Sequence, residues 1–384
     1  MKIAGGAAGL LRAGLLPTSC LLIAGISPAQ GFGHRSVGNQ QALITPDLER
    51  AVARGHEFLA KTQDPQGFWA QNVGFKLNTD YQVTAANTGH VGVTSLALMS
   101  FLAGGHVPGR GQYGDVLQRG LRYVLDCVKE NGFIQDNGSR MYSHAFATLL
   151  LAEIYGMNRR RDVREALQRA ITVIVDAQNT EGGWRYQLFA RESDMSITVC
   201  QVMALRSARN VGITVPQSTI RRAENYVKLS SVSGGSQRRN RLGSFLNSGG
   251  AFRYQKRPNT RATFPLTAAG ATTLFAAGNY ESTLIPPALE YLQGQLRMFN
   301  AYFGPSVGGH YFYYYGHYYA VQAFFVAGDP LWSKYFRVMK KDLLSTQRSG
   351  GHWPCEVGPG DAFATSVATL LLQIPYQYLP IFQR

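Results

Sequence analysis

Two kinds of helix alternate along the chain in the pattern of apolar and polar positions. One kind is amphipathic and charged, with apolar residues three and four positions apart, and the other kind is apolar on nearly every side. A helix that is apolar all round is buried, so we predict an inner layer of these helices and an outer, half-exposed layer of the amphipathic ones. The amphipathic segments include residues 47–63, 116–131, 163–179 and 332–347, and the apolar segments are 90–103, 142–155, 195–210, 266–277, 311–327 and 362–374.

A repeated motif connects each amphipathic segment to the apolar segment that follows it. A basic and a small residue precede an aromatic–aliphatic pair, and this pattern returns at intervals of about 50 to 65 residues. The best preserved copies continue into Gln, then Gly four residues later and Trp six residues later. Internal repeats are typical of folds in which similar helical units stack on their neighbours. Three copies are complete: Gln63 with Trp69, Gln178 with Trp184, and Gln347 with Trp353.

This motif resembles the QW repeat of squalene and oxidosqualene cyclases, which protein prenyltransferase β subunits share in a looser form. The resemblance extends over nearly the whole chain after residue 45. It implies an all-α fold, a single (α/α)6 toroid of six helical hairpins with inner and outer rings of helices. It also implies that the Gln and Trp residues of the motif are structural, tying each helix pair to the next.

The N-terminal residues are typical of an export signal. Lys2 and Arg12 accompany an apolar stretch, and Ser27-Pro28-Ala29 offers small residues for a cleavage site. The protein is then exported to the periplasm or the extracellular space, or held at the membrane by an uncleaved signal anchor. The predicted division of the chain is a signal peptide at 1–29, a short linker at 30–44, and the toroid at 45–384 with a mobile basic insertion at 231–249.

Composition and charge narrow the classes of function. With 45% hydrophobic residues the chain can bury a core, which excludes disorder as its main state, and four cysteines are too few for a disulfide-dense scaffold. The formal net charge is +15. A diphosphate head group, an anionic surface or polymer, or solubility alone would account for this charge. We expect no nucleic acid partner, because no nucleic-acid-binding module is visible. The sequence does not settle the oligomeric state.

Polar residues at the starts of the inner helices are candidates for chemistry, because in such a toroid these starts surround one mouth of the central cavity. Class II terpene cyclases, which the chain resembles, protonate an alkene with the middle Asp of Asp-x-Asp-Asp at one such start. Here only the last Asp is present, as Asp194, and Ser193 stands at the donor position. Either Glu192 or Asp194 replaces the donor, or the mechanism differs; Asp194 is also a good helix cap. The predicted catalytic residues are Asp194, Glu192, His144, His317 and Asp361.

Residues 311–319 are the most tyrosine-rich part of the chain. Aromatic faces can line an isoprenoid cavity and stabilise carbocations by cation–π attraction. The alternative is tight core packing, in which each hydroxyl group finds a hydrogen-bond partner. The residues predicted to line the cavity are His90, Tyr142, Tyr311, Tyr313, Tyr314 and Tyr318.

We expect neither a metal nor a cofactor. Protein prenyltransferases hold zinc with Asp, Cys and His, and this chain has no such set at matching positions. Asp194 and Cys200 are six residues apart on one predicted helix, so they do not face the same way.

Three functions stay open at this point. The first is an enzyme, a terpene cyclase-like isomerase or lyase or a prenyltransferase-like protein, that acts on an isoprenoid or another long apolar ligand. The second is a lipid-binding protein that uses the same hydrophobic cavity without turnover. The third is a structural or interaction toroid whose axis is filled by side chains. An axial cavity of about 300–1,000 Å³ would favour the first two.

Overall fold

The computed structural model describes residues 40–77, 80–232 and 249–382. The predicted signal peptide, residues 30–39 of the linker and most of the basic insertion lie outside the described residues, so their assignments stay predictions. Within the described part of the chain, no helix combines the length and apolar character needed to cross a membrane.

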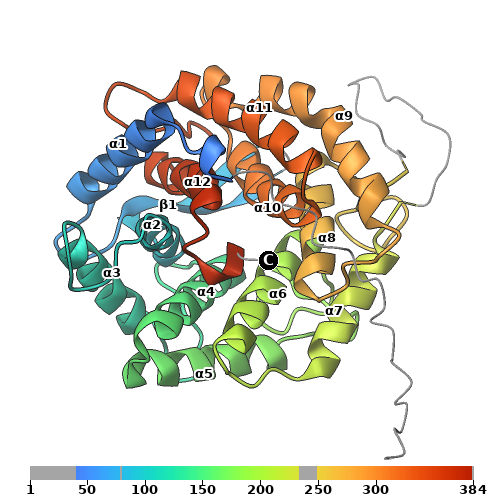
Figure 1. Cartoon of the computed structure of the whole chain (residues 1–384). Coiled ribbons are helices and arrows are strands. Elements are labelled where there is room, and N and C mark those ends of the chain that lie inside the picture. The colour runs from blue at the N-terminus through green and yellow to red at the C-terminus, as the bar shows by residue number, and fades with distance from the viewer. Residues whose placement is uncertain (1–39, 78–79, 233–248, 383–384) are drawn as a thin grey trace, which may run out of the picture. The chain divides into compact units, whose positions relative to one another are not determined.

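The amphipathic segments form the outer ring of helices (Figure 1). Each buries one stripe and exposes the other, because its apolar residues recur at helical spacing. The first helix shows the pattern: Leu48, Val52 and Leu59 are buried, whereas Arg50 is exposed. The outer helices are α1 (Pro46–Thr62), α3 (Gly114–Asp126), α5 (Arg161–Asp176), α7 (Gln217–Leu229), α9 (Ile285–Phe303) and α11 (Leu331–Thr346).

The apolar segments form the inner ring, and nearly every residue in them is buried. Each inner helix contacts the next, and the last one contacts the first, so the ring closes (Figure 1). The predicted all-α fold, a single toroid of inner and outer helices, is therefore confirmed. The inner helices are α2 (Val91–Ala103), α4 (Met141–Asn158), α6 (Met195–Asn210), α8 (Phe264–Ala276), α10 (Tyr311–Ala327) and α12 (Asp361–Gln373).

The glutamines of the repeated motif link neighbouring outer helices. Each side-chain amide lies at the end of one outer helix and donates to a backbone carbonyl of the next outer helix. One of these bonds, from Gln347, runs from the last outer helix to α1 and so helps to close the ring. The three bonds, each 2.9 Å, join Gln63 to Val116, Gln178 to Thr219, and Gln347 to Ala51.

The tryptophans of the motif are buried and fold back onto their own outer helix. Each indole N–H donates to a carbonyl ten residues earlier, which anchors the chain as it turns inward. The bonds join Trp69 to Leu59 at 2.9 Å, Trp184 to Ile174 at 2.7 Å, and Trp353 to Leu343 at 2.8 Å.

A β-hairpin that the helical pattern did not predict lies between α1 and α2. Strand β1 (Ala70–Leu77) pairs antiparallel with β2 (Asp80–Gly89), and Lys76 lies opposite Tyr81 in the register. The Asn72 backbone N–H donates to the Pro359 carbonyl at 2.9 Å, which ties the hairpin to the loop before α12.

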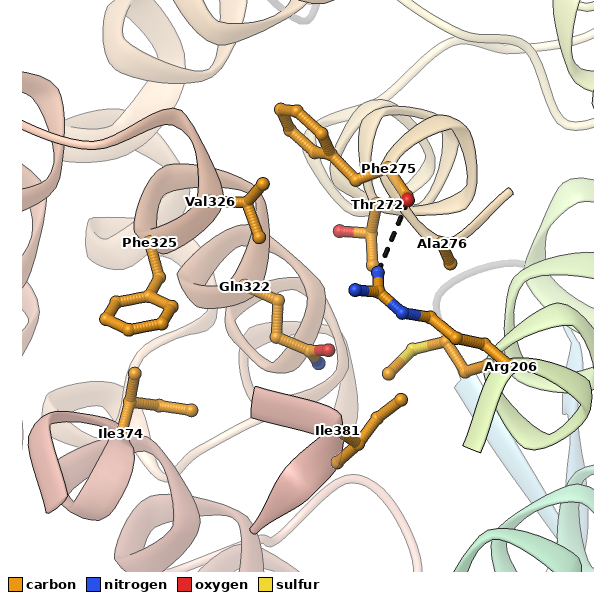
Figure 2. Close-up of a pocket in the computed structure, with 10 residues that line it drawn as sticks. Arg206, Thr272, Phe275, Ala276, Gln322, Phe325, Val326, Ile374 and Ile381 are labelled. Atoms are coloured by element: carbon orange, nitrogen blue, oxygen red, sulfur yellow. Dashed lines mark hydrogen bonds between the residues drawn. The ribbon is translucent and has the colours of Figure 1, made fainter. Parts of the chain in front are cut away.

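Short 3-10 turns accompany the ring. At the ends of α6, α8 and α10, the C-terminal residues Ile374 and Ile381 border a recess of only about 20 Å³, and Arg206 donates to the Phe275 carbonyl beside it at 3.3 Å (Figure 2). A recess of this size holds about one water molecule, so it offers no room for an organic ligand. The turns are η1 (Gln40–Leu43), η2 (Pro305–Val307), η3 (Ile374–Tyr376) and η4 (Pro380–Phe382).

Candidate functional site

A cavity of about 590 Å³ lies at the starts of the inner helices. Its lining comes from the first turns of those helices, from the β-hairpin and from α9. Four of the predicted lining residues border it: His90, Tyr142, Tyr311 and Tyr318.

Tyr313 and Tyr314 do not line the cavity. Successive residues of a helix point about 100° apart, so α10 turns Tyr311, Tyr315 and Tyr318 toward the cavity and these two away from it. Both are fully buried. The Tyr313 hydroxyl donates to Asp342 at 2.5 Å, and the Tyr314 hydroxyl donates to the Pro354 carbonyl at 2.7 Å. Each hydroxyl is satisfied within the protein, as tight core packing requires.

Two elements contribute lining residues that sequence reasoning missed. The hairpin supplies Phe75, Lys76 and Tyr81, and the inward side of the outer helix α9 supplies Tyr291, Gln295, Met298, Phe299, Tyr302 and Phe303. The alternation of apolar and polar residues through 73–85 is a strand signal that could have revealed the hairpin. Helix α9 is also less charged than the other outer helices, with Glu290 and Arg297 as its only charged residues, and this composition could have indicated that it faces a cavity.

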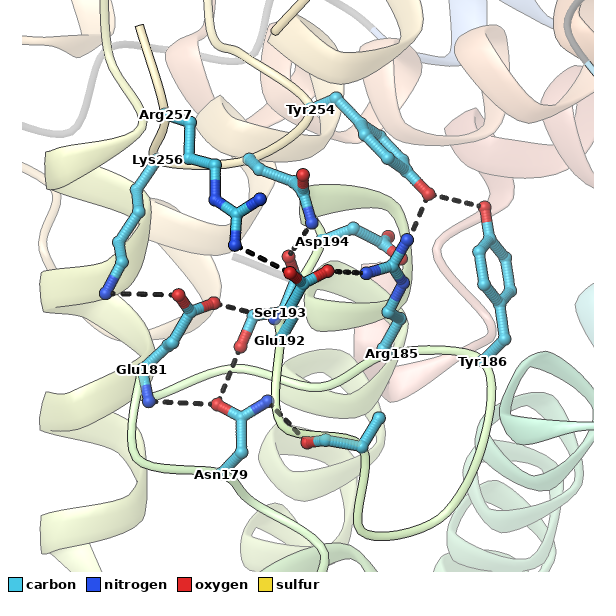
Figure 3. Close-up of polar contacts among 12 residues, drawn as sticks. Asn179, Glu181, Arg185, Tyr186, Glu192, Ser193, Asp194, Tyr254, Lys256 and Arg257 are labelled. Carbon is cyan, nitrogen blue, oxygen red and sulfur yellow. Dashed lines mark hydrogen bonds and ion pairs between the residues drawn. The ribbon is translucent and has the colours of Figure 1, made fainter.

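Asp194 caps α6 directly behind the cavity wall. Its carboxylate accepts from the Ile197 backbone N–H at 2.9 Å, the Ser196 hydroxyl at 2.6 Å and the Tyr254 hydroxyl at 3.3 Å. The hydroxyls of Tyr254 and Tyr186 lie 2.9 Å apart, so a chain of polar groups leads from the carboxylate to side chains that line the cavity (Figure 3). Burial raises the pKa of Asp194 to about 6.

Glu192 lies outside the cavity lining, at the partly exposed surface. It forms ion pairs with Arg257, at 2.6 Å, and with Arg185 (Figure 3). The hydrogen bond from Arg257 and its positive charge hold the pKa of Glu192 below its usual value, which keeps the group ionised. Ser193, at the donor position of the cyclase motif, is buried, and its hydroxyl donates to Asn179 at 2.8 Å.

His144 is fully buried, and both of its ring nitrogens contact backbone groups. Nδ1 accepts from the Ile134 N–H at 3.0 Å, and Nε2 donates to the Ala170 carbonyl at 3.2 Å. In four other hairpins, a threonine stands at the repeat position that His144 occupies here. The hydroxyl of that threonine accepts a hydrogen bond from the backbone N–H of the motif's Trp or Phe. These bonds join Trp69 to Thr94, Trp184 to Thr198, Phe252 to Thr267 and Trp353 to Thr365.

His317 and Asp361 also lie outside the cavity lining. His317 is buried between Tyr335, whose hydroxyl is 2.6 Å from Nδ1, and Asn300, 2.9 Å from Nε2. Burial lowers the pKa of His317 to about 3, so it is neutral at physiological pH. Asp361 begins α12 and accepts from the Cys355 backbone N–H at 2.9 Å.

His90 combines a capping role with a place at the cavity. It caps α2 by accepting from the Val93 backbone N–H at 3.3 Å, and burial lowers its pKa. The described residues contain no group of three His, Cys, Asp or Glu side chains that could hold a metal ion. The three described cysteines, Cys127, Cys200 and Cys355, are buried and form no disulfide with one another.

The cavity lining is mainly aromatic and aliphatic, with a cationic component. Lys76, Arg140 and Arg261 border it, and the lining contributed by the described residues includes no carboxylate. Tyrosine rings of the wall pack edge to face: the ring centres of Tyr142 and Tyr315 lie 6.2 Å apart. The site can hold a long apolar molecule and can hold negative charge.

Neither protein-family models nor curated proteins match this sequence. Solved structures do match the fold. The type II terpene cyclase MstE from Scytonema, in complex with geranylgeranyl dihydroxybenzoate, is 15% identical with a TM-score of 0.57, over 87% of this chain and 98% of that one. The α-1,6-mannanase GH76A of Salegentibacter, in complex with α-1,6-mannotriose, is 9% identical with a TM-score of 0.56, over 85% of this chain and 98% of that one. The GH76 α-mannanase BT2949 of Bacteroides thetaiotaomicron is 11% identical with a TM-score of 0.54, over 88% of this chain and 98% of that one.

These identities are too low to carry an activity across. They confirm the predicted resemblance at the level of the fold: the chain shares the α/α toroid that type II terpene cyclases and GH76 mannanases have in common.

Proposed function

We propose that this protein binds a long apolar small molecule, of the isoprenoid class, in the cavity at the starts of the inner helices. The observation that carries the proposal is the cavity itself, about 590 Å³ with a mainly aromatic and aliphatic wall. Organic ligands occupy sites of about 300–1,000 Å³ that are mostly apolar, with a few polar groups. The complex of MstE with a geranylgeranyl compound supports the same class of ligand.

A carbohydrate ligand fits the lining less well. Glycoside hydrolysis generally uses two carboxyl groups, one on each side of the scissile bond. The described residues that line the cavity supply no carboxylate, whereas they supply nine tyrosines, among them Tyr142, Tyr186 and Tyr254. The wall therefore favours the terpene cyclase ligand class over the mannanase class.

Acid–base chemistry on the bound molecule, as part of this proposal, starts from Asp194. Its raised pKa of about 6 leaves a fraction of the carboxyl protonated near neutral pH. Tyr254 and Ser196 contact this carboxyl and also line the cavity, so they connect it to the ligand. His144 and His317, which donate or accept bonds inside the core, take no part in the proposed chemistry.

The first experiment measures binding. Purified full-length chain is titrated with geranylgeraniol, and intrinsic fluorescence reports binding. Val367→Phe places a larger side chain inside the cavity and should weaken binding about tenfold or more. Val338→Phe makes the same change at a position that is 41% exposed on the outer helix α11 and should bind like wild type. If wild type binds no apolar ligand, or both variants bind equally well, the proposal fails.

The second experiment measures turnover. Wild type and Asp194→Asn are incubated with squalene or with polyprenyl alcohols, and extracted lipids are analysed by mass spectrometry. Because Asn cannot supply a proton, the variant should bind ligand normally but form no product. A variant that retains product formation would refute the role of Asp194. If the lipid stays unchanged and co-purifies with both wild type and the variant, the protein binds lipid without catalysis.

A further inference from the structure

Three cations converge on the cavity from separate parts of the chain. Lys76 lies on β1, Arg140 immediately precedes α4, and Arg261 lies in the loop before α8, yet all three line the same cavity. Within residues 40–77, 80–232 and 249–382, none of them forms an ion pair with a carboxylate. By contrast, Arg185 and Arg257, which lie outside the lining, both form ion pairs with Glu192.

Aromatic rings hold each cation in place without neutralising its charge. Lys76 Nζ lies 4.4 Å from the centre of the Phe312 ring. The Arg140 guanidinium lies 4.9 Å from the centre of the Phe75 ring, and that of Arg261 lies 4.9 Å from the Tyr254 ring. Lys76 lies on the hairpin, Arg140 packs on the hairpin residue Phe75, and the charge of Arg261 acts on Lys76, so the positive charge gathers at the hairpin side of the cavity.

The surroundings of Lys76 disfavour its charged form. Burial and the positive charge of Arg261 lower the pKa of Lys76 to about 7, and the negative charge of Asp194 only partly opposes them. An ammonium group in this situation gains stability from any anion that enters the cavity.

We infer that the ligand of this cavity carries an anionic head group, a carboxylate or a phosphate, at one end of its apolar chain, and that Lys76, Arg140 and Arg261 bind it. This inference rests on the proposed function, since the same cavity holds the apolar part. Arginine guanidinium groups bind carboxylate and phosphate oxygens through two parallel hydrogen bonds, and lysine adds a point charge. The aromatic remainder of the wall then encloses the chain.

The experiment compares three ligands with the same chain: geranylgeraniol, geranylgeranoic acid and geranylgeranyl phosphate. At pH 6 and low salt, at least one of the two anions should bind wild type about tenfold more tightly than the alcohol, as a charge-assisted contact predicts. The carboxylate and phosphate arms tell the two sources of charge apart. Raising the salt to 0.5 M should shrink the anion's advantage, because salt screens charges.

Two variants test the residues directly. Arg261→Gln and Lys76→Met should each weaken binding of the anion more than binding of the alcohol, and so remove most of the anion's advantage. Arg159→Gln is the matched control, because Arg159 also packs on an aromatic ring, Tyr155 at 5.0 Å, but does not line the cavity. Circular dichroism and thermal melts show whether each variant is folded.

The outcomes separate the two proposals. If alcohol and anions bind wild type equally, the head-group inference is overturned and the proposed function stands. If none of the three ligands binds, the proposed function fails. If a cavity variant does not fold, the wild-type comparison of ligands and its salt dependence still decide the head group.

Discussion

At the scale of single residues, Asp194 joins a structural and a chemical property in one side chain. It caps α6 by accepting from the Ile197 N–H, and it is a fully buried acid with a raised pKa. Asn caps a helix about as well as Asp and resembles the protonated carboxyl in shape, but it never ionises. The two residues can therefore be distinguished by the pH dependence of stability.

Asp194→Asn should change that pH dependence. The folded pKa of Asp194 is about 6 against a usual 3.8, so its contribution to stability is present below about pH 4 and lost as the pH rises through 6. Relative to wild type, the variant should gain up to about 3 kcal/mol in free energy of unfolding between pH 4 and pH 7. Urea denaturation across this range measures the difference.

Asp194→Ala is the control for the cap. It should lose about 1 kcal/mol at pH 4, where wild type and the Asn variant are nearly equal, because alanine offers no acceptor to Ile197. A constant gap between the Asn variant and wild type at every pH would contradict the raised pKa of Asp194.

At the scale of elements, the hairpin supplies part of the cavity wall and is fixed to the ring at the loop before α12. The strands approach closely at Gly74, where an added Cβ would lie 2.2 Å from the Gln82 carbonyl oxygen. No side chain fits there unless the backbone shifts, since even Ala carries that carbon. The hairpin can therefore be displaced by a single substitution outside the inner ring.

Gly74→Ala should shift Lys76 and Phe75 and weaken ligand binding about tenfold, while the helical circular dichroism signal stays the same because the rings are built without the hairpin. Gly294→Ala, on α9 with no atom within 4 Å of the added Cβ, is the matched control and should bind normally. Wild-type affinity in Gly74→Ala, measured by the same fluorescence titration, would show that the hairpin does not shape the site.

At the scale of the whole molecule, the closed ring makes the first and last hairpins neighbours. Gln347 bonds to Ala51 in the same way that Gln63 bonds to Val116, although the first pair spans nearly the whole described chain. A closed ring has no free end from which unfolding can start, so both contacts belong to one cooperative structure.

Gln347→Ala and Gln63→Ala should each lower the free energy of unfolding by about 1–2 kcal/mol, because each removes a partly buried hydrogen bond between hairpins. Both should unfold in a single transition in urea, followed by fluorescence and circular dichroism together. A separate early transition in Gln347→Ala alone would mean that the ring opens at this joint.

The alternation of buried and half-exposed helices could be predicted from the sequence, since helical periodicity is a local property. Apolar residues all round a segment require burial, and a single apolar stripe requires a surface, so the inner and outer layers followed from spacing. The resemblance to the QW repeat implied that these layers close into a toroid. The predicted starts of α6 and α10, Met195 and Tyr311, coincide with the observed ones. The position of Asp194 at a helix start also followed from the sequence.

The set of residues that line the cavity depends on tertiary packing and could not be predicted from local pattern. Lys76, Arg140 and Arg261 are far apart in sequence, and ring closure brings them to one wall. Tyr313 and Tyr314 point away from the cavity because the rotation of α10 about its axis is set by packing against α8 and α12. His144, predicted to be catalytic, instead accepts the Ile134 backbone N–H, at the repeat position where a threonine accepts the equivalent N–H in four other hairpins. Local pattern encodes which helices are buried, whereas packing between distant segments selects the side chains that meet a ligand.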